Sequence, residues 1–118
     1  MVENTHPDAN GRFGGGIWVT DSAAATIHGV LVRGNSSTGL AANGAGAVDA
    51  ERVVVASTML AGYPESEEVG YGFYCEKSPG FLLRRSITID NQLAGAFWLG
   101  CTGSVFEQVL VTRNTYSV

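Results

Sequence analysis

Short apolar runs recur along this chain at nearly constant spacing. One kind of run has an apolar residue, a short polar gap and three residues rich in β-branched side chains, and it closes on Asn or Thr. It occurs four times, at residues 27–35, 50–58, 83–91 and 105–114. Because the runs are short and alternate between apolar and polar positions, they predict strands rather than amphipathic helices.

A second kind of run begins with Gly and precedes each of these segments. Its leading apolar residues are separated by 23, 33 and 24 positions: Ile17, Leu40, Phe73 and Phe97. The last residues of the β-rich runs are separated by 23, 34 and 22 positions: Val32, Val55, Ile89 and Val111. Both kinds of run therefore share a period of about 23 and an extra stretch between the second and third repeats. Short strands that repeat in this way, each unable to bury a face alone, stack into a β-solenoid.

The two runs together read Gly-apolar-x-apolar, then apolar-x-x-apolar-x-apolar-x-x-Asn, over about residues 14–116. This pattern resembles the right-handed parallel β-helix family, the pectate-lyase-like solenoids. The resemblance implies an all-β, right-handed, single-stranded parallel β-helix of about four coils. Residues 1–13 would be an N-terminal lead-in and residues 14–118 the repeats, with an insertion at about 61–71. The fold hosts lyases, hydrolases, adhesins and inert spikes, so it does not identify a function.

Stacking the repeats at the predicted period assigns an inward row to each apolar position. The expected rows are Ile17, Leu40, Phe73 and Phe97; Val19, Ala42, Cys75 and Leu99; Val30, Val53, Ile87 and Val109; and Val32, Val55, Ile89 and Val111. The resemblance also implies a corner row whose amides bind turn backbone: Asn35, Thr58, Asn91 and Asn114. In this register Asn91 comes one residue early, so an imperfect row is expected.

The same register predicts two unusual outward rows. The first contains three aromatic residues and one alanine: Trp18, Ala41, Tyr74 and Trp98. Aromatic stripes of this kind suit sugar rings or a partner protein, although they can also cover a neighbouring loop. The second is mostly apolar: Leu31, Val54, Thr88 and Leu110. It predicts contact with a partner, unless the insertion covers it.

Composition limits the classes of partner. The formal net charge is −4, and 45% of the 118 residues are hydrophobic against 15% charged. Nucleic acid and anionic membrane surfaces are disfavoured, because both attract basic proteins. No apolar stretch approaches the roughly 20 residues that span a bilayer. The polar N-terminus is unlike a signal peptide. One interpretation is that the chain is cut from a longer secreted protein, which would place it outside the cell or at its surface.

The candidate chemistry is sparse. Cys75 is expected to be a buried thiol rather than a disulfide partner of Cys101, because the two do not stack in the predicted register. Two cysteines are too few for a zinc site, and no cofactor is predicted. The carboxylates of the insertion, Glu65, Glu67 and Glu68, fit a solvated loop better than a calcium site, because they lack a calcium-loop spacing.

The remaining ionisable residues do not form a recognisable catalytic set. His28 lies in an ordinary turn before a strand, and His6 lies in the polar N-terminal segment. There is no paired-Asp motif for glycoside hydrolysis and no Gly-x-Ser-x-Gly elbow. These observations favour a protein that is not an enzyme.

We therefore predict a structural or self-associating module that forms a homo-oligomer. Neither end of the predicted solenoid carries an amphipathic helix as a cap, and bare strand edges favour association. The contacts would be made through the open ends or through the outward apolar rows. The alternative is binding of polysaccharide along Trp18, Tyr74 and Trp98, by a fragment or relative of a carbohydrate-active β-helix protein.

Overall fold

The computed structural model describes residues 1–5, 14–60 and 70–116. All regular elements in these ranges are strands, and all of their pairings are parallel. Sheet A contains β1 (Val2–Glu3), β4 (Leu31–Arg33), β7 (Val54–Ala56), β10 (Ile87–Ile89) and β13 (Leu110–Thr112). Sheet B contains β2 (Ile17–Thr20), β5 (Ser37–Asn43), β8 (Gly70–Glu76) and β11 (Ala94–Leu99). Sheet C contains β3 (Ala25–His28), β6 (Val48–Glu51), β9 (Phe81–Arg84) and β12 (Val105–Glu107).

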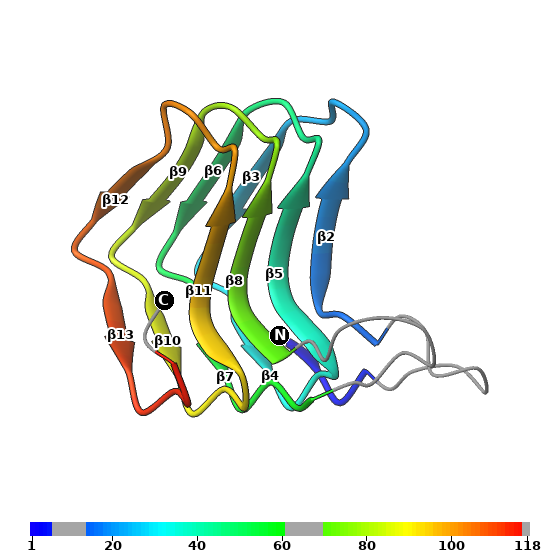
Figure 1. Ribbon diagram of the computed structural model, residues 1–118, viewed down its shortest axis with the longest axis vertical. Coiled ribbons are helices and arrows are strands. Elements are labelled where there is room, and N and C mark those ends of the chain that lie inside the picture. The colour runs from blue at the N-terminus through cyan, green and yellow to red at the C-terminus, as the bar shows by residue number, and fades with distance from the viewer. Residues whose placement is uncertain (6–13, 61–69, 117–118) are drawn as a thin grey trace.

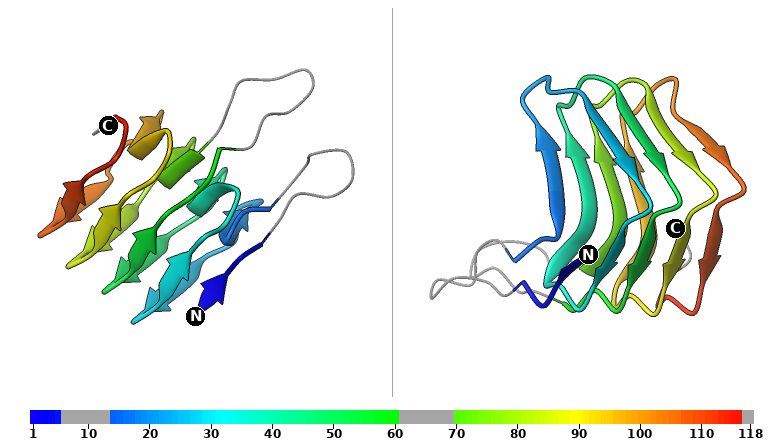
Figure 2. Two further views of the ribbon diagram at one scale, coloured as in Figure 1. Left: turned by 90° about the horizontal axis from the view of Figure 1, so that it is seen from below. Right: turned by 180° about the vertical axis from the view of Figure 1, so that it is seen from behind.

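Three consecutive strands place one strand in each sheet, and we call such a set a layer (Figure 1). Layer 1 is β2–β3–β4, layer 2 is β5–β6–β7, layer 3 is β8–β9–β10 and layer 4 is β11–β12–β13. The layers lie on one another in sequence order, as the view from below shows (Figure 2). The predicted solenoid-like, parallel all-β architecture is thus confirmed.

Two strands lie in segments predicted as lead-in and insertion. The lead-in expected at 1–13 contributes β1, which pairs with β4 through Val2 and Val32. Gly70 and Tyr71, at the end of the insertion expected at about 61–71, belong to β8. Residues 61–69, with Glu65, Glu67 and Glu68, lie outside the described residues, as does His6.

The spacing between stacked residues is more regular than the sequence predicted. In sheet A the inward row is Val32, Val55, Thr88 and Val111, so the third member is Thr88 rather than Ile89. In sheet B, Phe73 lies opposite Ala96 rather than Phe97, and Cys75 lies opposite Trp98 rather than Leu99. Each corrected row advances by 23, 33 and 23 residues, and so does the sheet C row Ile27, Ala50, Leu83 and Phe106.

Buried hydroxyls explain the error in layer 3. Thr88 is fully buried; its Oγ1 donates to the Gly95 carbonyl at 2.9 Å and accepts from Asn91 Nδ2 at 2.8 Å. Ser86 occupies the place predicted for Ile87, and its Oγ donates to the Arg84 carbonyl at 2.7 Å. A hydroxyl with local partners can fill a core position that hydrophobicity alone assigns to an aliphatic residue.

Close packing explains the glycine that begins each sheet B run. A Cβ on Gly39 would lie 2.1 Å from Val55 Cγ1, and one on Gly95 would lie 2.5 Å from Val111 Cγ1. Gly16 and Gly72 meet Val32 and Thr88 in the same way. In the observed pairing the inward residue is the one directly after the glycine, which in layer 4 is the small Ala96. This pairing places Phe97 outside and Trp98 inside.

The corner row is regular once Thr88 is aligned. Asn35, Asn91 and Asn114 each follow the inward sheet A residue by three positions, so Asn91 is not early. Asn91 Oδ1 accepts from the Thr58 backbone N–H at 2.9 Å, and Asn114 Oδ1 accepts from that of Asn91 at 3.0 Å. Asn35 Oδ1 accepts from the N–H of Thr5 at 2.9 Å. The predicted row is confirmed for its three asparagines, whereas Thr58 makes no such bond through its side chain.

Candidate interface at layer 4

The outward row of sheet A is apolar from end to end. Leu31, Val54 and Leu110 point outward as predicted, and the fourth member is Ile87 instead of Thr88. Leu31, Val54 and Ile87 are half-buried, because each is flanked by the neighbouring strand, whereas Leu110 is 54% exposed. The most exposed part of this row is therefore its end in layer 4.

The predicted aromatic row is also revised. Trp18, Ala41 and Tyr74 share a row, but its member in layer 4 is Phe97, since Trp98 points inward. The rings of Tyr74 and Phe97 stack on each other with centroids 5.5 Å apart and an interplanar angle of 8°. Each ring thus turns one face to the other rather than to solvent. Sugar binding by stacking needs an open ring face, so this pair is a poor platform.

Polar groups surround Tyr74. Its hydroxyl donates to Glu76 Oε2 at 2.7 Å, and Asn43 Nδ2 donates to the same oxygen at 3.3 Å. Lys77 Nζ lies 3.1 Å from the other carboxylate oxygen of Glu76. The hydrogen bond from Tyr74, followed by that from Lys77, lowers the pKa of Glu76. Burial and the hydrogen bond to Glu76 raise the pKa of Tyr74.

Trp98 joins an aromatic cluster that runs from the core to the end of the molecule. Its ring lies edge-on to Phe81, at 5.3 Å between centroids, and to Phe106, at 4.3 Å. Phe81 is fully buried, whereas Phe106 is 47% exposed. Among the described residues, the buried indole N–H of Trp98 has no hydrogen-bond partner. Trp98 follows Val19, Ala42 and Cys75 in its row, and the larger ring fits because no described layer packs beyond it.

Layer 4 exposes several large apolar side chains, and one of them continues a row that layers 2 and 3 bury. Phe106 continues the inward row in which Ala50 and Leu83 are fully buried. Val105 is 49% exposed, Leu99 52% and Leu110 54%. At the opposite end of the stack, the inward residues Val19 and Ile27 are only 7% and 8% exposed. The two ends of the molecule therefore differ, and we call Leu99, Val105, Phe106 and Leu110 the layer-4 surface.

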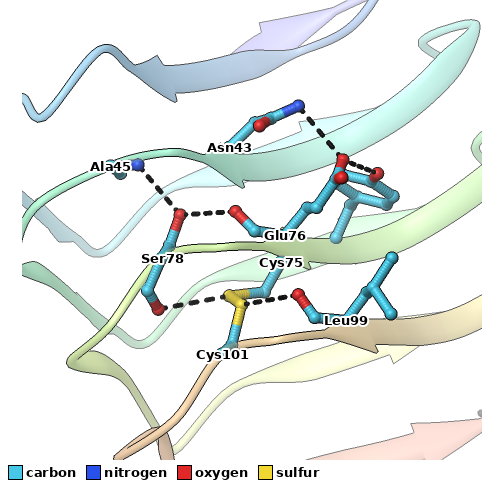
Figure 3. Close-up of a disulfide and its surroundings, with 8 residues drawn as sticks. Asn43, Ala45, Cys75, Glu76, Ser78, Leu99 and Cys101 are labelled. Carbon is cyan, nitrogen blue, oxygen red and sulfur yellow. Dashed lines mark hydrogen bonds between the residues drawn. A yellow bond between two sulfur atoms is a disulfide. The ribbon is translucent and has the colours of Figure 1, made fainter.

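A disulfide joins layer 4 to layer 3, contrary to the prediction. Cys75 and Cys101 are bonded, with Cα atoms 6.3 Å apart (Figure 3). The prediction was wrong because it considered only stacking along the strands, whereas Cys101 lies beyond the end of β11. The turn at Gly100, which has a φ of 65°, then brings Cys101 back over Cys75. Cys75 is fully buried as expected, and its sulfur lies 3.7 Å from the Ser78 carbonyl oxygen.

The outer face of sheet C carries ion pairs. Arg84 Nη2 donates to both carboxylate oxygens of Asp49, at 2.9 and 3.0 Å. Glu51 lies 3.2 Å from Arg85 Nη1 and 3.7 Å from His28 Nε2. The hydrogen bond to Asp49 raises the pKa of Arg84. Asp49 also borders a shallow depression with Ala24, Thr26 and Leu82, but Arg84 already binds its carboxylate.

Within the described ranges, no group of three or more His, Cys, Asp or Glu side chains could hold a metal ion. The same ranges contain no helix long and apolar enough to cross a membrane. No known protein family, curated protein or solved structure matches this chain.

Proposed function

We propose that this chain is a non-enzymatic structural module that self-associates through the layer-4 surface. In this proposal the stack is a right-handed, single-stranded parallel β-helix of about four coils, with a period of about 23 residues. The main support for this proposal is the exposure of Phe106. The members of its row in layers 2 and 3 are fully buried. Exposed apolar side chains beside unpaired strand edges favour contact with another protein.

A second copy fits this surface better than an unrelated partner. The outer edges of β11, β12 and β13 belong to three different sheets, and they offer backbone donors and acceptors except at the start of β11, where Ala94 already bridges Tyr116. Only a partner with strands at the same three places can pair with all of them at once. Another copy of this chain has such strands.

The expected affinity is moderate. Complete burial of a Leu, Val or Phe side chain contributes about 1.5–3 kcal/mol. The four residues of the layer-4 surface are already about half covered. Even complete burial in both copies would thus contribute at most an amount comparable with the association cost of about 4–15 kcal/mol. We therefore expect a reversible, concentration-dependent assembly rather than a permanent one.

Sedimentation velocity over a range of protein concentrations tests this proposal. The native chain should shift from monomer to a larger species as concentration rises, and Phe106→Ser should weaken that shift. Trp18→Ser is the matched control, because Trp18 is 48% exposed against 47% for Phe106 but lies in layer 1. A native chain that stays monomeric at high concentration would contradict the proposal.

Polysaccharide binding is the second proposal, now along Trp18, Tyr74 and Phe97. The observation in its favour is the exposed Trp18 ring on the face that also carries Asn43 and Glu76. The stacking of Tyr74 on Phe97 makes this proposal the weaker of the two. Retention on acidic and neutral polysaccharides, compared between the native chain and Trp18→Ala, tests it; equal elution from blank and loaded matrices would reject it.

We further propose that the protein works in an oxidising compartment, outside the cell or at its surface. The Cys75–Cys101 bond supports this location, because disulfides persist mainly in such environments. Thiol labelling of the protein isolated under acid quench, without reductant, tests the proposal. Two reactive thiols in the denatured chain would contradict it.

A further inference from the structure

We infer that copies of this chain stack head to tail, with β1 of one copy pairing with the outer edge of β13 of another. This inference rests on the proposed function, and it specifies which strand of the second copy meets the layer-4 surface. The strand order of sheet A is β1-β4-β7-β10-β13, so β1 and β13 are its two edges. Among the described residues, no strand pairs with the outer edge of either one. Their contact would continue sheet A from copy to copy.

The two ends of the stack are incomplete in complementary ways. Beyond layer 4, Tyr116 bridges Ala94 and occupies the place where a further strand of sheet B would begin. The N–H of Gly95 donates to the Tyr116 carbonyl at 2.9 Å. Before layer 1, β1 occupies a further place in sheet A. Tyr116 of one copy and β1 of the second copy can therefore share one layer, because they occupy different sheets.

The other ways of joining the ends are obstructed. Direct contact of layer 4 with layer 1 would pair β11 with β2 of the second copy, β12 with β3 and β13 with β4. However, β1 already occupies the edge of β4, and Tyr116 occupies the start of the edge of β11. A two-fold contact between two layer-4 surfaces would need that same edge of β11. The shared layer displaces neither β1 nor Tyr116.

The backbone groups at the two edges match. Alternate residues of a parallel strand turn their N–H and C=O groups toward opposite neighbours. In β13 the N–H of Leu110 donates to the Ser86 carbonyl at 2.9 Å, so the N–H and C=O of Val111 face the free edge. In β1 the N–H of Asn4 donates to a carbonyl of β4 at 3.1 Å, so the N–H and C=O of Glu3 face away from β4. The N–H of Glu3 in the second copy can therefore donate to the Val111 carbonyl.

The apolar side chains also match in this register. Val2 pairs with Val32 in the inward row of sheet A, and the same row ends in Val111. Val2 of the second copy would lie opposite Val111 and would extend the row. Met1 of that copy would lie opposite Leu110. Since Met1 is 73% exposed and Leu110 54% exposed, each would cover apolar surface of the other.

The charges at the two edges are complementary. At the β13 edge, Arg113 Nη2 lies 2.7 Å from Asp90 Oδ2 in the layer below. At the β1 edge, Glu3 Oε2 lies 2.6 Å from Arg33 Nε in the layer above. Stacking brings Arg113 of one copy beside Glu3 of the second, so positive and negative side chains alternate across the contact. Exposed ion pairs add little affinity, but this order favours the head-to-tail register over one that brings like charges together.

The stack would also cover the interior of layer 4. The described residues supply no strand of sheet C to the shared layer, so β12 would face β3 of the second copy across the width of one strand. The inward residues of layer 4 are larger than those of layer 3, Phe106 against Leu83 and Trp98 against Cys75. Their rings can fill part of that space. Layer 1 of the second copy would then cover Phe106, as the proposed function requires.

The contact is heterologous and repeats from copy to copy. Each copy adds the five strands of sheet A, a rise of about 24 Å at about 4.8 Å per strand. Such a contact builds an open filament rather than a closed dimer. Sedimentation should therefore show a series of growing species. Trp18 points outward from sheet B at the rim of the contact, where truncation costs little, so Trp18→Ser remains the control for Phe106→Ser.

Cross-linking between the two edges tests the inference. Glu3 and Thr112 would be directly opposite, with Cα atoms about 4.8 Å apart, which is within the range of a disulfide. The native cysteines are bonded to each other, so Glu3→Cys and Thr112→Cys each add one thiol. Mixed under oxidised glutathione, the two variants should form a covalent dimer on a non-reducing gel that neither forms alone. Val105→Cys, in layer 4 but in sheet C, should not link to Glu3→Cys.

The double variant Glu3→Cys/Thr112→Cys gives a second readout. Within one copy the two positions are four strand spacings apart, about 19 Å, so they cannot bond to each other. Oxidation should instead produce a ladder of covalent oligomers. If the native chain associates but the mixed variants do not link, or if Val105→Cys links equally well, the inference fails and self-association stands. If the native chain stays monomeric in sedimentation, the proposed function fails as well.

A proline variant tests the same edge without new thiols. Glu3→Pro removes an N–H that faces the free edge, a position at which proline is tolerated. Self-association should weaken at least about tenfold, because a hydrogen bond is lost and the ring obstructs β13. Glu3→Gln keeps the N–H and should retain most of the association. Should circular dichroism show that a cysteine variant is misfolded, equal association of Glu3→Pro and the native chain would overturn the inference.

Discussion

The side chain of Asn91 accepts a hydrogen bond from the backbone N–H of Thr58 at 2.9 Å, one layer away. Thr58 fills the same corner in layer 2, but its buried Oγ1 has no hydrogen-bond partner among the described residues. The shorter side chain does not reproduce the bond that the amides of Asn91 and Asn114 make to the preceding layer. Layer 2 thus interrupts the corner row.

Thr58→Asn should complete this row. The new amide oxygen would accept from the backbone N–H of Asn35, as Asn91 does from Thr58, and the unpaired hydroxyl would be removed. We expect a gain of about 1 kcal/mol in the free energy of unfolding, measured by urea denaturation. Asn91→Thr is the reverse control and should lose at least as much. A loss of stability in Thr58→Asn would show that the corner cannot accept the amide.

Breaking the Cys75–Cys101 bond should loosen layer 4 before the other layers. The bond closes a segment of 26 residues, for which the chain-entropy contribution is about 3.5 kcal/mol. We expect the double variant Cys75→Ala/Cys101→Ala to lose about that much stability. Hydrogen exchange should accelerate first in residues 94–112, together with a change in the fluorescence of Trp98. Uniform acceleration through all layers would indicate instead that the stack unfolds as one unit.

The corners between sheets C and A should favour glycine. Gly29, Arg52, Arg85 and Gln108 occupy equivalent corners, and all four have positive φ values between 47° and 64°. A side chain in this left-handed region costs about 1–2 kcal/mol. Arg52→Gly should therefore stabilise the protein by about 0.5–1 kcal/mol, after the greater backbone entropy of glycine is subtracted.

Two further variants distinguish the effect of relieving backbone strain from the effect of removing the Arg52 side chain. Arg52→Ala removes the side chain without relieving the backbone strain, so it should not stabilise the protein. Gly29→Ala should be destabilised, although a Cβ at that position has no atom within 4 Å. Thermal unfolding of the three variants checks the order. Equal effects of Arg52→Gly and Arg52→Ala would reject the strain argument.

Acid should weaken the ion pairs on the surface. Arg113 lowers the pKa of Asp90 below its ordinary value of 3.8, and Tyr74 with Lys77 lowers that of Glu76 below 4.5. A carboxyl whose pKa is lower in the folded state stabilises the fold above its unfolded pKa, and this contribution is lost as the pH falls through the folded pKa. Urea denaturation at pH 7 and pH 3 should thus show a smaller difference for Glu76→Gln than for the native chain. An identical difference would mean that Glu76 does not contribute.

Much of the architecture could be predicted from the sequence because the strands are short and repetitive. Neither a three-residue run such as 31–33 nor its repeat at 54–56 can bury a face alone, so a constant spacing implies stacking. The extra residues before Gly70 and the corner amides at Asn35 and Asn114 could be predicted from the same constant spacing. Leu31, Val54, Leu110, Trp18 and Tyr74 were correctly placed outward, since their rows are set by neighbouring apolar residues.

The register within layers 3 and 4 depended on contacts that hydrophobicity does not encode. Thr88 and Ser86 enter the core because local carbonyls satisfy their hydroxyls. In layer 4, Gly95 lies against Val111 and Ala96 pairs with the inward Phe73. The observed register of β11 differs from the predicted one by a single residue. Because such a shift exchanges the two faces of a strand, Trp98 points inward and Phe97 outward.

The period of about 23 residues and the parallel stacking are properties of the sequence itself, because each repeat carries the same local preference for a strand and a corner. The Cys75–Cys101 bond and the difference between the two ends were decided only by the tertiary structure. The bond requires the turn at Gly100 beyond the end of β11, and the two ends differ in part because β1 covers β4 at one of them. These features depend on residues far apart in the chain, whose positions no local pattern determines.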